Sequence, residues 1–428
     1  MRLHRVLLGC AAATMSMPVI LVGGAAQASF PGTNGDIAWS ASCNVANGAG
    51  NNINGQQVFS SVNNPASPLT CGNYSPVTAG AADATPYFNS AGTTMYFASN
   101  RNGPWAIYAV RYPNGLTPAG GGTFTDGATQ LTNLSNSSGY DYSPVVSSGG
   151  MPLLAWIRCA GSSSTTCSIY DETLGSNGQP SGPETVVPTK VGVAAPNNVS
   201  GDGNRPEINP ANSDDLLYVG TDGHIHLMSL SQGPNSDVDL SAASQCAASV
   251  CGAGNQSITS GEADEHPDWA PDGQAIVFDS NRVSGLTGQN NRNTTFTLSN
   301  LSVANPTVAP VWHGLPNNSS SQIEPVYAPG TTADVTVNPG QGNTGAPPTL
   351  AWVSTIRGSN VQTVADGSVA NTTNLTNDNQ NNDEPIWQPQ GPGANAPETP
   401  ITFLVPIVGG SILGVAGFAV RRRGRRTS

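Results

Sequence analysis

Short stretches of alternating apolar and polar residues recur along the chain. They are rich in β-branched and aromatic side chains and are separated by glycine, proline, asparagine and aspartate, a pattern typical of strands joined by tight turns. The clearest are TMYFAS (94–99), LLAWIR (153–158), LLYVGT (216–221), AIVFDS (275–280) and LAWVST (350–355). A second strand follows in several units, as in WAIYAV (105–110), CSIYDE (167–172) and HIHLMS (224–229). The pattern predicts an all-β chain built from hairpins.

A proline precedes each of the five strands TMYFAS to LAWVST, and a sixth such proline stands near the end of the chain. Two positions after each of these prolines stands an apolar side chain. The prolines are Pro86, Pro144, Pro206, Pro267, Pro325 and Pro385, with Phe88, Val146, Ile208, Trp269, Tyr327 and Trp387 as their partners. A turn follows, clearest as APDG (270–273), and some units close with Leu-Thr, at 131–132 and 375–376. A repeat of about 60 residues indicates one supersecondary unit used several times.

The last unit is incomplete, because no alternating strand follows Trp387. The missing strands stand at the other end of the chain, as GDIAWSAS (35–42) and QQVFSS (56–61), where no proline element precedes them. We therefore expect strands from both ends to share one sheet and to close six units into a ring, which leaves only short, protected sheet edges. The alternative, an open solenoid, would need atypical capping repeats.

One unit, DEHPDWAPDGQAIVFDSNR (264–282), resembles the TolB-type, WD-like β-propeller repeat, whose motif is D-x-x-P-x-W-S-P-D-G-x-x-I-x-F-x-S-x-R. DATPYFNSAGTTMYFASNR (83–101) follows it less closely, the units at Pro144 and Pro206 are degenerate, and the unit at Pro325 carries an insertion before its strand. The resemblance implies a six-bladed β-propeller over residues 29–391, closed by N- and C-terminal strands that share one blade. It implies little about the ligand, because propellers of this type serve as scaffolds, interaction partners and side domains of peptidases.

Both ends of the chain carry targeting features. Residues 1–28 have a basic start, an apolar run and an A-x-A site, the layout of a secretory signal peptide. A Pro/Gly linker (392–400) precedes twenty uncharged residues (401–420), long enough for one transmembrane helix, and a basic tail (421–428). Because arginines stay on the cytoplasmic side, we expect the propeller on the extracellular face of the cell membrane.

The linker also contains APETP (396–400), which partly matches the cell-wall sorting signal L-P-x-T-G. Pro397, Glu398 and Thr399 match, whereas Ala396 and Pro400 do not. A transpeptidase would have to cleave a Thr-Pro bond that lacks an N–H. We expect a retained membrane anchor, with attachment to the cell wall as the alternative.

Charge and cysteines narrow the picture further. Between the two ends, eight Lys and Arg residues stand against 27 Asp and Glu residues, so nucleic acid is not an expected partner. Four of the six cysteines outside the leader form two close pairs, which favours local disulfides in an oxidising compartment. The expected pairing, one of fifteen that six cysteines allow, is Cys43–Cys71, Cys159–Cys167 and Cys246–Cys251.

Carboxylates cluster just before most of the repeat prolines. They are Asp83, Asp141, Asp264, Glu265, Glu324, Asp383 and Glu384. One interpretation is a ring of binding acids at the mouth of a central channel, suited to a cation or a cationic ligand. The alternative is that each acid caps a turn or pairs with a blade arginine such as Arg101 or Arg282.

Other polar groups give weaker signals. His224 and His226 share one strand face with Asp222 nearby, but no third ligand stands at a recognisable spacing, so we expect ordinary strand residues and assign no metal. His266 is expected to be a paired loop histidine. The run NDNQNNDE (377–384) lacks the glycine and terminal glutamate of an EF-hand loop. Motifs for a nucleophile elbow, a zinc protease or a phosphate-binding loop are absent from the sequence, and we expect no cofactor, although a divalent cation is compatible with the acids.

The function expected from these features is a non-catalytic binding or assembly module at the cell envelope. Its partner would be an envelope protein, a peptide or a glycan. The alternative is a propeller hydrolase or lyase that acts on peptides or glycans, with channel carboxylates such as Asp264 and Glu384 as its catalytic groups.

Overall fold

The computed structural model describes most of one compact unit, Met1–Pro392. The described residues are 33–43, 45–46, 52–53, 56–61, 68–70, 75–79, 82–113, 117–119, 123–132, 139–149, 151–161, 164, 166–195, 204–243, 263–281, 293–299, 301, 311–314, 322–329, 350–354, 360–364, 372–377 and 382–390. None of the helices within these residues is long and apolar enough to cross a membrane. The predicted signal peptide, linker, transmembrane helix and tail lie outside the described residues.

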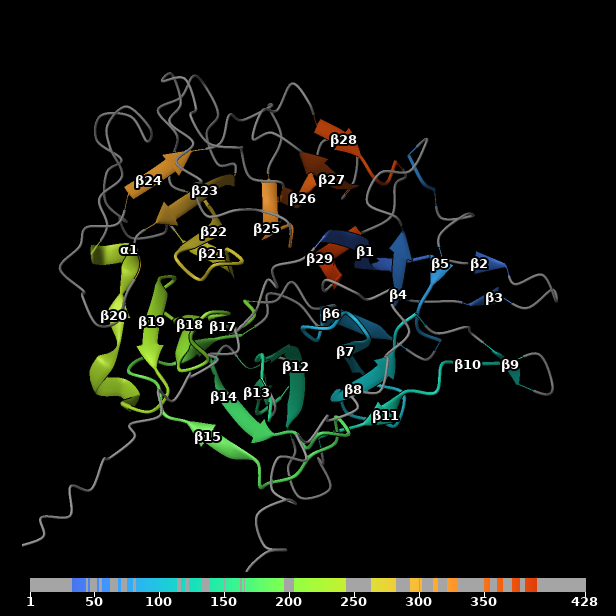
Figure 1. The fold of residues 1–428 in the computed structure, drawn as a ribbon, viewed down its shortest axis with the longest axis horizontal. Coiled ribbons are helices and arrows are strands. Elements are labelled where there is room, and N and C mark those ends of the chain that lie inside the picture. The colour runs from blue at the N-terminus through green and yellow to red at the C-terminus, as the bar shows by residue number, and fades with distance from the viewer. Residues whose placement is uncertain are drawn as a thin grey trace, which may run out of the picture. The chain divides into compact units, whose positions relative to one another are not determined.

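The described strands form six antiparallel sheets of four or five strands, as well as two short hairpins (Figure 1). In strand order, the first three sheets are β29 (Asn382–Gln390), β1 (Thr33–Ser42), β4 (Gln56–Ser61) and β5 (Ser75–Pro76); β6 (Asp83–Phe88), β7 (Thr94–Ser99), β8 (Ala106–Arg111) and β11 (Thr129–Gln130); and β12 (Tyr140–Val146), β13 (Leu153–Cys159), β14 (Thr166–Thr173) and β15 (Thr185–Val187), with β16 (Val193–Ala194) also on β14.

The other three sheets follow in chain order. They are β17 (Glu207–Ile208), β18 (Asp215–Val219), β19 (Ile225–Ser229) and β20 (Val238–Asp239); β21 (Asp264–Trp269), β22 (Ala275–Ser280), β23 (Thr294–Ser299) and β24 (Val311–Gly314); and β25 (Gln322–Tyr327), β26 (Leu350–Ser354), β27 (Asn360–Val364) and β28 (Thr372–Asn374). The hairpins are β2 (Val45–Ala46) with β3 (Asn52–Ile53) and β9 (Thr117–Ala119) with β10 (Thr123–Thr125). A 3₁₀ turn (Gly233–Ser236) and the helix α1 (Leu240–Ala243) flank β20.

The two ends of the described chain share one sheet, as the sequence predicts. Strand β29 pairs antiparallel with β1, which places Trp387 opposite Ile37 and Ile386 opposite Ala38 (Figure 1, red beside dark blue). Side chains reinforce the pairing, since the Trp39 Nε1–H donates to Asn382 Oδ1 at 3.0 Å. Residues more than 340 positions apart in sequence therefore complete one sheet.

Contacts between the sheets close into a cycle. The strands that contain or directly follow the repeat prolines contact one another in the order β6, β12, β17, β21, β25, β29 and back to β6. Between these sheets lie the largest fully buried side chains, among them Trp39, Trp156 and Trp269. Successive antiparallel sheets that pack face to face around such a cycle are the arrangement of a β-propeller.

The Leu-Thr pairs at the ends of the units have a defined role. The hydroxyl Oγ1 of Thr132 accepts a hydrogen bond from the Ile107 N–H at 3.0 Å, and Thr376 does the same for Val361 at 2.9 Å. The preceding leucine is buried in both units. The pair therefore caps the third strand of a sheet while its leucine packs into the core.

One predicted disulfide is present. Cys159 and Cys167 are bonded across the β13–β14 hairpin, where they are register partners. Cys43 is also disulfide-bonded, but its predicted partner Cys71 lies outside the described residues, as do Cys246 and Cys251.

A glycine in the turn between β6 and β7 permits a close contact between this sheet and strand β29 of the neighbouring sheet. Gly92 has φ +65°, and a Cβ built there would lie 2.1 Å from the backbone oxygen of Pro389. Its own carbonyl accepts a hydrogen bond from Gln388 Nε2 at 2.9 Å. Only glycine combines this conformation with so close an approach of two backbones.

We predict that Gly92→Ala destabilises the protein more than Gly127→Ala. Gly127 has a similar φ of +70°, but none of the described residues comes within 4 Å of the place that an alanine methyl group would take. Its substitution should cost about 1–2 kcal/mol from the left-handed backbone alone, and Gly92→Ala about 1–3 kcal/mol more from overpacking. Urea unfolding of both variants measures the difference, and equal losses would contradict the close contact of β29 with the β6–β7 turn.

Candidate functional site

The residue before the repeat proline adopts an unusual backbone conformation in five sheets. Thr85, Ser143, His266, Glu324 and Glu384 all have φ between 51° and 56°. The register of each strand pair shifts at the same place, which marks a β-bulge. Proline cannot donate to the ladder, so it is tolerated in an inner strand only at such a bulge.

The five bulged residues and Arg205, which precedes Pro206, surround one pocket that is partly open to solvent. We call it the pre-proline pocket. Its lining consists of the residues before the six repeat prolines and four further residues: Thr85, Ser143, Arg205, His266, Glu324, Glu384, Pro267, Pro325, Val326 and Pro385. Residues in sparsely populated backbone conformations often cluster at ligand sites.

A chain of hydrogen bonds runs along part of this lining. The Glu384 N–H donates to Glu324 Oε2 at 2.5 Å, the Thr85 N–H donates to Glu384 Oε2 at 2.6 Å, and the Ser143 N–H donates to Thr85 Oγ1 at 3.3 Å. Before them, the Glu324 N–H donates to Asp279 Oδ1 at 3.1 Å. Four of the five bulges thus turn a backbone N–H toward a side chain of the preceding sheet.

Two lining groups keep polar atoms available. Ser143 is fully buried, His266 is 9% exposed, and neither Ser143 Oγ nor His266 Nε2 has a hydrogen-bond partner among the described residues. The other ring nitrogen, His266 Nδ1, lies 2.6 Å from Asp279 Oδ1. Buried polar atoms are normally satisfied, so these two point to a group that binds in the pocket.

The charge on His266 follows from its neighbours. Burial alone would lower the pKa of the imidazole, but the adjacent Asp279 carboxylate, Glu324 and Glu265 together outweigh burial, so the pKa rises to about 10. At neutral pH the ring is therefore a cation, and Nε2 is a hydrogen-bond donor.

Arg205 provides a second cation at the pocket. Its Nε donates to Glu207 Oε1 at 2.5 Å, and its guanidinium lies over the Tyr87 ring, 5.4 Å from the centroid. Burial raises the pKa of Glu207 to about 7 against the opposing effect of Arg205, and burial beside Glu207 raises that of Asp268. The hydrogen bond to Glu207 and the contact with the Tyr87 ring hold the Arg205 guanidinium in place.

Of the seven acids that the sequence singles out, two line the pocket. These are Glu324 and Glu384. Asp83 and Asp141 are fully buried and pair instead with Arg101 at 2.9 Å and Arg158 at 2.6 Å, the second of the two roles that the sequence allowed.

The other three acids lie elsewhere. Asp264 accepts a hydrogen bond from the Ser241 hydroxyl at 2.7 Å, Asp383 lies opposite Ser40 in β1, and Glu265 is partly exposed. His266 is paired, as expected. Arg282 lies outside the described residues.

The sequence analysis missed Thr85, Ser143 and Arg205 as pocket residues. It followed carboxylates rather than a position, although the relevant position was the one directly before each proline. These three residue types carry no shared chemistry, and only the repeated bulge brings them together.

Two groups of side chains have metal-binding atoms within 4.8 Å of one another among the described residues. In the first, Glu265, His266 and Asp279, the imidazole and Asp279 already share a short hydrogen bond, so we interpret it as an ion pair. The second, Asp222, His226 and Asp239, lies in the β17–β20 sheet, away from the residues of the pre-proline pocket.

Comparison with known proteins supports the fold. No protein-family model and no curated protein sequence matches the chain. Among solved structures, TolB from Acinetobacter baumannii aligns with 83% of this chain and 67% of its own, at 13% identity and a TM-score of 0.51. The hydrazine synthase of Kuenenia stuttgartiensis aligns with 86% of this chain but 48% of its own, at 14% identity and a TM-score of 0.46.

A putative TolB from Agrobacterium tumefaciens aligns with 71% of this chain and 84% of its own, at 12% identity and a TM-score of 0.43. The similarity to TolB from Acinetobacter baumannii agrees with the sheet topology described above. The chain therefore has a β-propeller fold similar to that of TolB.

We predict a pH-dependent stability that depends on His266. The folded pKa of about 10 lies above the ordinary value of 6.5, so the stabilisation is complete below about pH 6.5 and is lost as the pH rises through 10. The free energy of unfolding should fall over this range by at most about 1.4 kcal/mol per pH unit for this one proton.

Urea unfolding at several pH values measures this slope. His266→Gln should remove the contribution of His266 to this slope. The same slope in the wild type and in His266→Gln would disprove the assignment.

Proposed function

We propose that the chain is a six-bladed β-propeller that acts as a non-catalytic binding module at the cell envelope. The six sheets, the cyclic contacts of the strands that contain or directly follow the repeat prolines, and the pairing of β29 with β1 support this number of blades and this mode of closure. The resemblance of the repeats to TolB-type propellers is compatible with interaction with a partner molecule but does not by itself assign a function.

The single observation that carries the proposal is the pair of unpartnered, buried atoms in the pre-proline pocket, His266 Nε2 and Ser143 Oγ. A protonated imidazole and a hydroxyl donate hydrogen bonds to an oxygen acceptor. The ligand group that suits them is a carboxylate or carbonyl of an envelope peptide or protein. Leaving such donors buried and unsatisfied costs about 1–3 kcal/mol each, which a bound acceptor would recover.

The alternative function is that of a hydrolase or lyase. It is supported by the placement of His266, a proton donor, with two carboxylates, Glu324 and Glu384, in the same pocket. Asp264, the acid first considered for this role, is fully buried against Ser241 and does not line the pocket. Turnover of peptides or glycans that is lost in Glu384→Gln would favour this alternative over binding.

For localisation, we propose secretion through the signal peptide at residues 1–28 and retention by the apolar segment at 401–420. The composition of both segments supports this.

We predict that pocket variants lose a specific partner. The full-length protein, fixed to a resin, is incubated with a detergent extract of the cell envelope, and retained proteins are identified by mass spectrometry. A partner that binds at the pocket should be retained by the wild type and by Gly127→Ala, and lost by both Ser143→Ala and His266→Gln. An identical retained set for all four proteins would contradict the pocket as the binding site.

We also predict that a chain truncated before residue 401 appears in the culture medium, because it lacks the proposed anchor. The full-length chain should stay with the membrane fraction and resist extraction by high salt. Retention of the truncated chain in the membrane fraction would contradict anchoring by this segment.

A further inference from the structure

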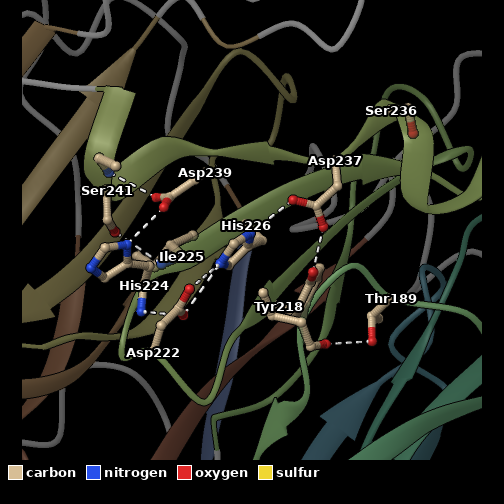
Figure 2. A network of polar contacts seen from close by, with 12 residues as sticks. Thr189, Tyr218, Asp222, His224, Ile225, His226, Ser236, Asp237, Asp239 and Ser241 are labelled. Carbon is tan, nitrogen blue, oxygen red and sulfur yellow. Dashed lines mark hydrogen bonds and ion pairs between the residues drawn. The ribbon is translucent and has the colours of Figure 1, made fainter.

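A second polar cluster lies in the β17–β20 sheet, apart from the pre-proline pocket (Figure 2). Asp222 and His224 come from the turn between β18 and β19, and His226 is the second residue of β19. Asp239 ends β20, and Asp237 directly precedes this strand. The two histidines are the pair that the sequence analysis noted, where a third ligand was missing. The fold supplies carboxylates from thirteen and fifteen residues beyond His224.

The imidazole of His226 is held in one orientation. Its Nδ1 lies 2.8 Å from Asp237 Oδ1, and the Tyr218 hydroxyl donates to the same carboxylate. The ring is 2% exposed and stacks on Tyr218 with centroids 5.0 Å apart. A carboxylate that accepts a hydrogen bond from one ring nitrogen fixes the tautomer and presents the other nitrogen, the usual arrangement around a metal-bound histidine.

The presented nitrogen, Nε2, faces Asp222 at a distance that suits a shared ion. It lies 3.3 Å from Oδ1 and 3.2 Å from Oδ2 of Asp222. Charge-assisted hydrogen bonds are shorter, about 2.7–2.9 Å. Two ligands bound to a tetrahedral zinc ion at about 2.0–2.2 Å lie about 3.4 Å apart.

Asp239 completes the set from the outer strand of the sheet. One of its oxygens lies within 4.8 Å of the ligand atoms of Asp222 and His226, and His224 Nδ1 lies 2.7 Å from Asp239 Oδ2 (Figure 2). His224 therefore positions Asp239 as Asp237 positions His226. Two of the proposed ligands keep access to solvent, since the side chains of Asp222 and Asp239 are 37% and 27% exposed.

A glycine keeps this space open. A Cβ on Gly220 would lie 2.4 Å from Asp222 Oδ1 and 3.0 Å from His226 Nε2. Any larger residue at this position would displace the two atoms that face each other. The absent side chain is thus a condition for the close approach of Asp222 and His226, independent of the hydrogen bonds within the cluster.

We propose that Asp222, His226 and Asp239 bind a divalent metal ion of the zinc type, with Asp237 and His224 as positioning residues. Mixed imidazole and carboxylate ligands suit zinc better than calcium or magnesium. Three protein ligands leave the fourth position of a tetrahedral ion to solvent. The ion would tie the β18–β19 turn to β20, the outermost strand of its sheet, and would stabilise this sheet edge.

Zinc binding by the full-length protein tests the proposal. The chain is stripped with EDTA, and Zn²⁺ is then titrated by equilibrium dialysis, with Co²⁺ as a spectroscopic substitute. We expect one ion per chain at this site, with the intense visible bands of four-coordinate cobalt. Asp222→Asn and Asp239→Asn should weaken binding at least tenfold, and Asp237→Asn should do so by about 10- to 100-fold.

Asp214→Asn is the matched control. Asp214 directly precedes β18 of the same sheet and accepts hydrogen bonds from Ser229 and Ser231. It belongs to no contact of the cluster given above, so the variant should bind zinc like the wild type. Zinc should also raise the melting temperature of the wild type and of Asp214→Asn, but not that of Asp222→Asn.

Equal zinc binding by the wild type and Asp222→Asn would overturn the proposal. A wild type that binds no zinc would also overturn the proposal. The cluster would then be a hydrogen-bond network in which the imidazole of His226 donates to the carboxylates. Because Asp222 and Asp239 are partly exposed and their replacements are isosteric, a loss of binding with an unchanged circular dichroism spectrum cannot be ascribed to unfolding.

Discussion

The antiparallel pairing of β29 with β1 is the interaction on which the rest of the structure depends. Without this pairing, one edge of β1 would be unpaired. Strand β29, which carries the pre-proline residue Glu384, would have no strand partner. Since Glu384 accepts the Thr85 N–H and its own N–H donates to Glu324, the pairing also joins the first and last bulges of the pocket lining. Closure of the fold and assembly of the candidate site are therefore one event.

The x-Pro bulge explains why a degenerate repeat still forms a regular site. The side chain before the proline varies from serine to glutamate, whereas the left-handed backbone persists in five sheets and the hydrogen-bonded N–H in four of them. Arg205 is the exception, because β17 begins only after Pro206, at Glu207. The chain of hydrogen bonds does not extend from Ser143 to this residue, and the unpartnered Ser143 Oγ lines the pocket at that interruption.

The strands and their closure were predictable because both follow from local alternation and from complementary halves of one unit. TMYFAS and AIVFDS coincide with β7 and β22, and the pairing of the two ends was expected from the incomplete last unit together with GDIAWSAS and QQVFSS near the start of the chain. The site was predicted only in part. Whether an acid forms an ion pair with an arginine depends on how far the side chains reach between strands, as for Asp83 and Arg101. The proximity of His226 to Asp237 and Asp239 depends on the pairing of β20 with β19.

The order in which the strands are synthesised has a consequence for biogenesis. Strand β1 leaves the ribosome among the first, but the partner that covers its edge is the last strand of the domain to be made. Contacts at such long sequence separation form late and slowly. The sheet that β1 and β29 share therefore cannot be completed before β29 has been made, and until then β1 keeps an uncovered edge.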